Sequence, residues 1–485
     1  MNFEKFDDAK KDDSVLNSFT RDQKIAYENL VAFIEKGYVE GDYRRALIGA
    51  AGTGKTYMIR EVIKRCGLAK SVIGLAAPTH KAARVLRVST GYATSTVASD
   101  LGLRLNTDVT DFDVNNPPFD PLAEKKIKQY KLYIVDEASM IGINLKTLIE
   151  RECEQFGCML IYMGDNYQLP PVKETRSRCF DNIKFYTLRQ IVRQEESNPV
   201  SELLRILRKD IDNRTWKFLE FINRNRYAFD STQTKGYYTC GAFEFQSLVI
   251  DGFYNEEFTR DVDTCRLVTY TNKSVSDWNK LIRKNIIEDS GKAILTKNDL
   301  VMSYNTFIDD FKDTIIVNSE DYIIHDIKNF TNRDNIHGFN VTFIQVNGGN
   351  RTKPLFVVDH SDFNNAMLYY KLGESYIYNA INADKYNRTK RWKEYYEFRE
   401  RNLLLVNLLD KATNKIKFSR DLDYGFALTS HKAQGSTYAD VYIDINDIIF
   451  DTRTGNPWGD IDNTLRRLYT ACSRCKNRLY LCYGQ

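Results

Sequence analysis

The chain has 485 residues, of which 42% are hydrophobic and 28% charged, with 9 prolines and a formal net charge of +4. This length predicts several domains with ample hydrophobic cores, and the composition is typical of globular rather than disordered or fibrous proteins. The mild charge neither requires nor excludes an anionic partner, because acidic surface elsewhere can offset a basic groove. No run of about 18 apolar residues occurs, so we expect no membrane span.

Nine cysteines are scattered along the chain, and the first residues are charged rather than apolar. With no secretory segment ahead of them, we expect reduced thiols and a cytoplasmic protein. Cys472 and Cys475 form a C-x-x-C, a spacing found in half of a zinc site or in a redox motif. No second pair at a matching spacing accompanies it, so we predict no zinc site.

Two sets of apolar runs indicate strands, with segments of helical period between them. The first set is YRRALIGA, SVIGLAAPT, KLYIVDEAS and CMLIYMGD, and the second is CRLVTYTNK, YGFALTSHKAQGS, ADVYIDI and NRLYLCYG. Each set predicts an open parallel α/β sheet. Roughly residues 298–423 interrupt the second set with short alternating strands and a charged aromatic helix, which predicts a β-rich insertion with a helical arm.

The segment GAAGTGKT, residues 49–56, fits G-x-x-x-x-G-K-[ST] after an apolar strand and before a helical pattern. Gly49, Gly52 and Gly54 allow backbone N–H groups to surround a phosphate at a helix amino terminus. Lys55 adds a charge near the β and γ oxygens, and Thr56 offers a hydroxyl to Mg²⁺. The alternative, a plain glycine-rich turn, does not explain the strand and helix on either side.

Acidic residues follow the strand LYIV. Asp136 is placed to hold Mg²⁺, and Glu137 to orient and deprotonate an attacking water. A general base beside the γ-phosphate favours hydrolysis over the kinase reaction, which must exclude water. The structural alternative is that these carboxylates only cap a helix.

Three further side chains are candidates at the same nucleotide. Gln168 in MGDNYQLPPV follows a strand and is placed to sense the γ-phosphate, although an ordinary polar loop has the same pattern. Arg193 in LRQIVRQ and Arg474 in YTACSRCKNRLYL are candidates for stabilising charge in the transition state. A surface salt bridge is the default role of a lone arginine.

Nine motifs in order resemble those of superfamily 1 helicases, and the match is closest to the Dda-type phage helicases of the RecD-like branch. They are FTRDQKIAYENL, GAAGTGKT, APTHKAARVL, VDEASM, GDNYQLPPV, LRQIVRQ, TYTNKSVSDWN, LTSHKAQGST and YTACSRCKNRLYL. The resemblance implies two RecA-like lobes, the first over residues 1–195 with a pin-like hairpin insertion at about 97–125. The second lobe is expected over 196–297 and 424–485, with the insertion 298–423 as its β-barrel-like part and helical arm.

The resemblance also implies roles for individual residues in ATP and Mg²⁺ binding. Gln23 would recognise adenine, and Gln168 would couple to the γ-phosphate. Arg193 and Arg474 would close on the nucleotide from the other lobe, so that hydrolysis opens and closes a cleft.

Contacts to a single DNA strand are implied for loops in both lobes, with little sequence preference expected. In the first lobe these residues are Pro78, Thr79, His80 and Thr96, and in the second they are Asn272, Lys273, His431 and Lys432. As a structural alternative, His80 at a strand end is equally suited to a capping role.

One segment of the first lobe departs from the family pattern, and a second segment has two possible interpretations. The chain reads TVAS where the family often has a histidine, so Ala98 leaves one strand contact missing or supplied elsewhere. Residues 101–120 are expected to hold the hairpin that wedges a duplex apart, with Phe112 or Phe119 at its tip. A plain acidic loop has the same turn signals.

We therefore predict an ATP-dependent helicase that translocates on single-stranded DNA, with 5′ to 3′ movement expected from the family alone. Its partners would be tailed or forked duplex DNA and a single-strand-binding protein, and we expect a monomer acting in phage DNA replication or recombination in the host cytoplasm. The alternatives are an RNA helicase, a translocase that displaces proteins, and a non-motor ATP switch.

Overall fold

The computed structural model describes residues 13–103, 124–190, 198–308, 314–346, 348–410 and 413–484. The chain forms two compact units, one of residues 1–78 and 82–197 and one of residues 79–81 and 198–485. No helix in the described ranges is long and apolar enough to cross a membrane.

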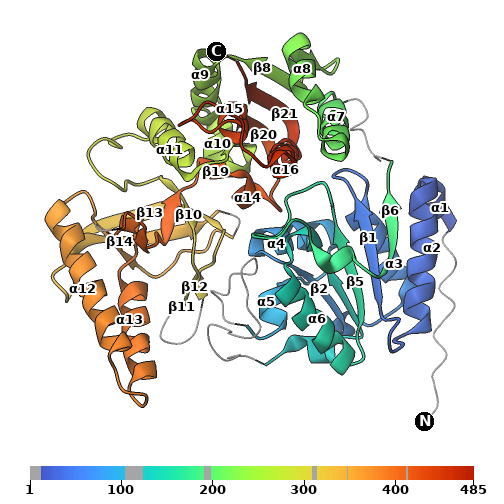
Figure 1. Cartoon of the computed structure of the whole chain (residues 1–485), viewed down its shortest axis with the longest axis horizontal. Helices are drawn as coiled ribbons and strands as arrows, with labels where there is room; N and C mark the ends of the chain where they lie inside the picture. Colours follow the sequence, from blue (N-terminus) through green and yellow to red (C-terminus); the bar gives the residue numbers. More distant parts are fainter. Residues whose placement is uncertain are drawn as a thin grey trace. The chain divides into compact units, whose positions relative to one another are not determined.

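The first unit contains a sheet of six parallel strands in the order β3-β2-β4-β5-β1-β6 (Figure 1). The strands are β1 Arg44–Gly49, β2 Ile73–Ala77, β3 Ser95–Thr96, β4 Leu132–Val135, β5 Met159–Gly164 and β6 Lys184–Leu188. Its helices are α1 Asp13–Ser18, α2 Arg21–Lys36, α3 Lys55–Cys66, α4 His80–Thr90, α5 Val97–Asp100 and α6 Ile143–Gln155. Of α4, residues 82–90 belong to this unit.

Both faces of this sheet are buried, and β4 shows why its sequence is apolar throughout. Leu132 and Ile134 pack into a core shared with α2, α3 and α4. Tyr133 and Val135 point the other way, into a core shared with α5 and α6. Strands covered by helices on both faces lack the alternation of a half-exposed strand, so the continuous apolar runs correctly predicted a parallel α/β sheet.

The second unit has its own six-stranded sheet, in the order β19-β9-β20-β21-β8-β7, and all strands except β7 run parallel. The strands are β7 Tyr227–Phe229, β8 Gly236–Cys240, β9 Cys265–Thr269, β19 Ala427–Thr429, β20 Tyr438–Asp444 and β21 Cys475–Cys482. Its helices are α7 Val200–Asn213, α8 Lys217–Arg224, α9 Ala242–Phe253, α10 Glu256–Arg260, α11 Asn272–Ile286, α14 Ser430–Ala433, α15 Ile445–Ile449 and α16 Ile461–Cys472. The second predicted α/β sheet is therefore confirmed.

In the sequence between β9 and β19, the chain forms an antiparallel sheet in the order β15-β14-β13-β10-β18, with β15 and β18 at its edges. Its strands are β10 Leu300–Ser303, β13 Asp321–Thr331, β14 His337–Gln345, β15 Leu355–Val358 and β18 Leu422–Tyr424. Two small pairs accompany it, β11 Phe307–Ile308 with β12 Thr314–Ile316 and β16 Leu408–Leu409 with β17 Ile416–Phe418. Helices α12 Phe363–Ile381 and α13 Arg388–Arg401 pack as a hairpin (Figure 1), so the arm has two helices where the sequence suggested one.

Candidate nucleotide and nucleic-acid sites

The phosphate-binding loop has the backbone that its glycines predict. Gly52 and Gly54 have φ of 79° and 80°, a left-handed conformation that residues with a Cβ rarely adopt. A Cβ on Gly49 would lie 2.5 Å from Thr53 Oγ1, so the loop also packs too closely for a side chain there. Helix α3 begins at Lys55 and directs its first N–H groups toward the loop.

Lys55 and Asp136 lie close together in this unit. The Lys55 ammonium donates to the carbonyl oxygens of Gly49 at 2.6 Å and Ala50 at 3.1 Å. Burial raises the pKa of Asp136, and the charge of Lys55 opposes that rise. Asp136 Oδ1 also accepts a hydrogen bond from Glu137 N at 2.8 Å. The cation and carboxylate expected from two separate motifs are thus brought to one site.

Glu137 has an unusual backbone conformation, with φ of 52° and ψ of 37°. A non-glycine residue in this left-handed region is destabilised by about 1–2 kcal/mol, and such strain concentrates at functional sites. Glu137 directly follows the half-buried Asp136 at the carboxyl end of β4, the sheet edge at which α/β proteins bind ligands. This backbone conformation sets the direction of the Cα–Cβ bond from which the carboxylate extends.

Two glutamines belong to the same unit. Gln168 is buried in the loop after β5, and its backbone N–H donates to the backbone oxygen of Asp165 at 3.2 Å. Gln23 caps α2, where its Oε1 accepts from Thr20 N at 3.0 Å, and its Nε2 donates to Thr53 O at 2.9 Å. Gln23 therefore fixes the phosphate loop to α2, and its role toward adenine stays a prediction.

The two arginine predictions remain untested. Arg193 lies outside the described residues, as do Phe112 and Phe119. Arg474 is buried in the second unit and donates to Thr470 O at 3.1 Å, Ser436 O at 3.2 Å and Ser473 Oγ at 2.8 Å. These bonds give Arg474 a structural role within its own unit, which the sequence analysis did not foresee.

The predicted DNA contacts around β2 and β3 have different surroundings. Pro78 is buried, whereas Thr79 and His80 are half-buried. Burial lowers the pKa of His80, which keeps it neutral at pH 7. Thr96 is buried, and its hydroxyl accepts from Ser99 N at 3.2 Å as the cap of α5.

A pocket of about 470 Å³ in the second unit contains three of the four DNA contacts predicted there. Its lining residues are Tyr270, Thr271, Asn272, Tyr304, Thr429, His431, Lys432 and Trp458. The pocket lies where the adjacent parallel strands β9 and β19 end and α11 and α14 begin. The fourth prediction, Lys273, is not in the lining: its side chain is 82% exposed and its Nζ lies 2.6 Å from Asp277 Oδ2.

The pocket wall combines cations, a neutral histidine and aromatic rings. Burial, and secondarily the charge of Arg467, lowers the pKa of His431 to about 4. Lys432 Nζ lies 4.6 Å from the ring centre of Tyr304, and Arg420 lies 4.4 Å from it. The sequence analysis missed Tyr304 and Trp458, because neither lies in a motif and only the fold brings them to this edge.

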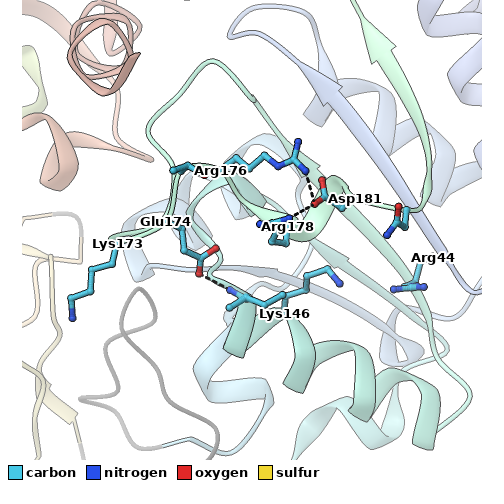
Figure 2. A pocket seen from close by; sticks show the side chains of 10 residues that line it. Arg44, Lys146, Lys173, Glu174, Arg176, Arg178 and Asp181 are labelled. Atoms are coloured by element: carbon cyan, nitrogen blue, oxygen red, sulfur yellow. Dashed lines mark hydrogen bonds and ion pairs between the residues drawn. The ribbon is translucent and has the colours of Figure 1, made fainter. Parts of the chain in front are cut away.

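A second cavity, of about 640 Å³, lies on the first unit beside α6 (Figure 2). It is a basic groove that contains none of the predicted residues. Arg176 and Arg178 both pair with Asp181, at 3.1 and 3.3 Å, and Arg44 pairs with Glu150 at 2.8 Å. Three arginines of the groove are therefore paired with acidic side chains of the same unit, and we assign the groove a structural role.

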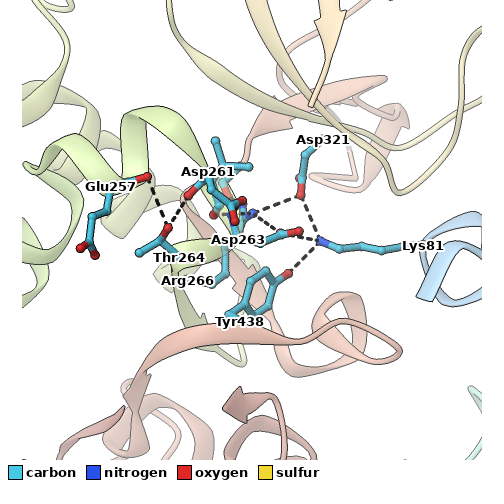
Figure 3. Close-up of polar contacts among 10 residues, drawn as sticks. Lys81, Glu257, Asp261, Asp263, Thr264, Arg266, Asp321 and Tyr438 are labelled. Atoms are coloured by element: carbon cyan, nitrogen blue, oxygen red, sulfur yellow. Dashed lines mark hydrogen bonds and ion pairs between the residues drawn. The ribbon is translucent and has the colours of Figure 1, made fainter. Parts of the chain in front are cut away.

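The second unit, to which residues 79–81 are assigned, contains a buried ionic network (Figure 3). Asp321 Oδ2 accepts from Arg266 Nη2 at 3.1 Å and from Lys81 Nζ at 3.0 Å, and Lys81 also donates to Tyr438 OH at 3.0 Å. Lys81 follows His80 directly, so this network fixes the end of the segment APTHK.

Comparison with known proteins gives a family model described as an AAA domain, which matches residues 21–224. An uncharacterized protein, R530, of Acanthamoeba polyphaga mimivirus is 24% identical over 95% of this chain and 99% of its own length. The ATP-dependent DNA helicase dda of Enterobacteria phage T4 is 24% identical over 59% of this chain and 63% of its own length. The ATP-dependent RecD2 DNA helicase of Deinococcus radiodurans is 35% identical over 32% of this chain and 20% of its own length.

Among solved structures, the chain is similar to a Pif1 helicase from Candida albicans, at 16% identity and a TM-score of 0.49 over 96% of this chain and 94% of that one.

The phosphate loop, with Lys55 and Asp136 beside it on a parallel sheet, defines an ATP-binding P-loop protein. In its ordered motifs and its matches to relatives, the chain is similar to superfamily 1 helicases of the RecD and Dda type.

Proposed function

We propose that this helicase translocates on single-stranded DNA, driven by ATP hydrolysis, and unwinds the duplex ahead of it. The observation that carries the proposal is the pocket of the second unit. At two adjacent strand ends it combines Lys432, the amino terminus of α11 and three aromatic rings. Cations and helix amino termini bind backbone phosphates, and aromatic rings stack bases of any sequence.

In the first unit, the proposed reaction is attack of water on the γ-phosphate of ATP, which breaks the bond from the γ-phosphorus to the oxygen that bridges it to the β-phosphate and releases ADP and phosphate. Glu137 orients the water and accepts its proton, the backbone N–H groups of residues 49–56 bind the phosphates, and Lys55 neutralises their charge. Gln168 senses the γ-phosphate. Arg193 and Arg474 stabilise the developing charge, which requires Arg474 to exchange its present hydrogen bonds for phosphate oxygens.

Thr56 and Asp136 are the residues that would hold Mg²⁺. Both supply the hard oxygen ligands that Mg²⁺ prefers, and two protein ligands suffice because this ion retains several waters. The described residues include no cluster of three or more acidic, histidine or cysteine ligands, which fits a metal shared with the nucleotide. When bound, Mg²⁺ neutralises charge on the phosphates.

The family resemblance supports 5′ to 3′ movement, and the viral and phage relatives support a role in phage DNA replication or recombination in a host cytoplasm. We propose that the protein acts there as a monomer. A single-strand-binding protein is a further proposed partner. Matched duplexes with a 5′ or a 3′ tail test the direction of movement. We expect the 5′-tailed duplex to be unwound, and unwinding of only the 3′-tailed duplex would contradict 5′ to 3′ movement.

The central experiment measures ATP hydrolysis with and without oligo(dT), followed by unwinding of a tailed duplex. We expect DNA to accelerate hydrolysis. A rate indifferent to nucleic acid would support the non-motor switch instead. Stronger stimulation by oligo(U) than by oligo(dT) would indicate an RNA helicase, and stimulation without unwinding would indicate a translocase that displaces proteins.

A further inference from the structure

Trp458 lies in the loop between α15 and α16 and forms part of the pocket wall, although no motif includes it. The loop turns back on itself, with a bridge between Phe450 and Pro457 and a hydrogen bond from Trp458 N to Ile449 O at 2.9 Å. The half-buried indole is therefore placed by the backbone rather than free to sample solvent.

The indole is also fixed by two neighbours. Its Nε1 donates to Asp447 O at 3.2 Å, and its ring meets that of Tyr270 at 78° with 5.2 Å between centroids. On Tyr270, the guanidinium carbon of Arg467 lies 3.7 Å from the ring centre. The polar edge of the indole is thus satisfied within the protein, and the two rings do not stack flat on each other, so what Trp458 offers a ligand is apolar ring surface.

Asp447 connects this wall to the loop that leads into α11. Its buried carboxylate accepts hydrogen bonds from the hydroxyl of Thr269, from Tyr270 N at 2.7 Å, and from Thr271 N and Oγ1 at 2.8 and 2.7 Å. Its side chain thereby determines the course of the loop that leads into α11, while its carbonyl oxygen holds Trp458. One residue therefore sets the spacing between loop 270–272 and the aromatic wall.

We propose that Trp458 is a stacking platform for a base of the bound single strand, and that Asp447 is the positioning residue that sets this platform against loop 270–272. The inference rests on the proposed function, because it names how the strand is held in the same pocket. A base that stacks on a ring makes no hydrogen bonds through its edge, and every base has a flat face. The contact therefore accepts any sequence but requires that a base be present.

An abasic oligonucleotide separates this role from backbone binding, because it keeps the phosphates and lacks the bases. We expect Trp458→Ala to weaken binding of oligo(dT) by about 5- to 150-fold, the range measured for one stacked base, and to leave binding of the abasic oligonucleotide unchanged. Trp458→Phe should retain most of the affinity. Equal weakening toward both oligonucleotides, or no weakening, would overturn the proposal.

Fluorescence gives a readout that does not depend on activity. Oligo(dT) should quench the tryptophan emission of the wild-type protein, and Trp458→Phe should abolish that quenching while preserving binding. Trp392→Phe is the matched control, because Trp392 packs against Tyr395 and Tyr396 in α13 and is not in the pocket lining. Quenching that survives in Trp458→Phe and disappears in Trp392→Phe would refute the assignment.

A double-mutant cycle tests the role of Asp447. Asp447→Ala should weaken oligo(dT) binding as much as Trp458→Ala does, and the double variant should be no weaker than either. Asp447→Asn, which keeps one side-chain oxygen as the acceptor for three of these four donors, should restore most of the affinity. Fully additive losses would show that Asp447 acts elsewhere.

Unfolding midpoints and binding of a fluorescent ATP analogue in the first unit show whether each variant is folded. If wild type fails to bind oligo(dT), the proposed function fails. If wild type binds and Trp458→Ala binds equally well, only the present inference fails.

Discussion

Arg266 and Asp321 form a buried ion pair, with Nη2 and Oδ2 3.1 Å apart, that joins β9 of the parallel sheet to β13 of the inserted sheet (Figure 3). Both side chains are almost fully inaccessible to solvent, at 0% and 4% exposure. Lys81 shares the same carboxylate oxygen at 3.0 Å. One aspartate therefore compensates two buried cations, and its loss leaves them only the longer ion pairs to Asp263, at 3.7 Å from Arg266 and 3.9 Å from Lys81.

We expect Asp321→Ala to lower the free energy of unfolding by about 3–5 kcal/mol, the usual result of removing one partner of a buried pair. Urea denaturation monitored by circular dichroism measures it. Asp326→Ala on the same strand is the control, because its pair with Lys328 is 3.6 Å long and both side chains are more than half exposed, so a small change is expected. Similar losses in the two variants would contradict the argument.

Replacing Lys55 by Ala should reduce ATP hydrolysis by at least about 100-fold, since it removes a preorganised charge from the phosphate site. The fold should persist, because the hydrogen bonds that Lys55 donates go only to carbonyls of its own loop. Lys64→Ala, on the exposed side of the same helix α3, is the matched control and should hydrolyse ATP normally. An active Lys55→Ala protein would refute the nucleotide site.

Substitutions of Glu137 should affect the rate of ATP hydrolysis and the stability of the fold in different ways. Glu137→Gln should bind ATP but hydrolyse it about 10²- to 10⁴-fold more slowly, because the amide cannot accept the proton of water. Glu137→Gly should be equally inactive yet more stable by roughly 1 kcal/mol, because glycine adopts a φ of 52° without strain. Steady-state hydrolysis and thermal unfolding measure the two effects, and a less stable Glu137→Gly would show that the side chain has a structural role.

The sequence predicted those parts of the fold and site that depend on local patterns. Apolar runs such as the one ending at Val135 predicted central strands, and the glycine spacing predicted the turn that leads into α3. Edge strands such as β7, which is half exposed, left no comparable signal. Trp458 and Asp447 were missed because their importance comes from contacts with residues about 180 positions away in the sequence, for which a single sequence carries no pattern.

His431 predicts a specific dependence of stability on pH. Its pKa in the folded protein is about 4, against 6.5 for a free histidine, mainly through burial and secondarily through Arg467. Between these two values the unfolded chain binds a proton that the folded chain does not, so stability should fall as the pH drops below about 6.5 and level off near 4. The full difference corresponds to about 3 kcal/mol. His431→Gln should remove this part of the pH dependence, measured as the difference in unfolding free energy between variant and wild type at pH 7 and pH 4.5, whereas parallel profiles would show that His431 titrates normally. His80→Gln is the control for a second, half-buried histidine with a lowered pKa, and its effect should add to that of His431→Gln.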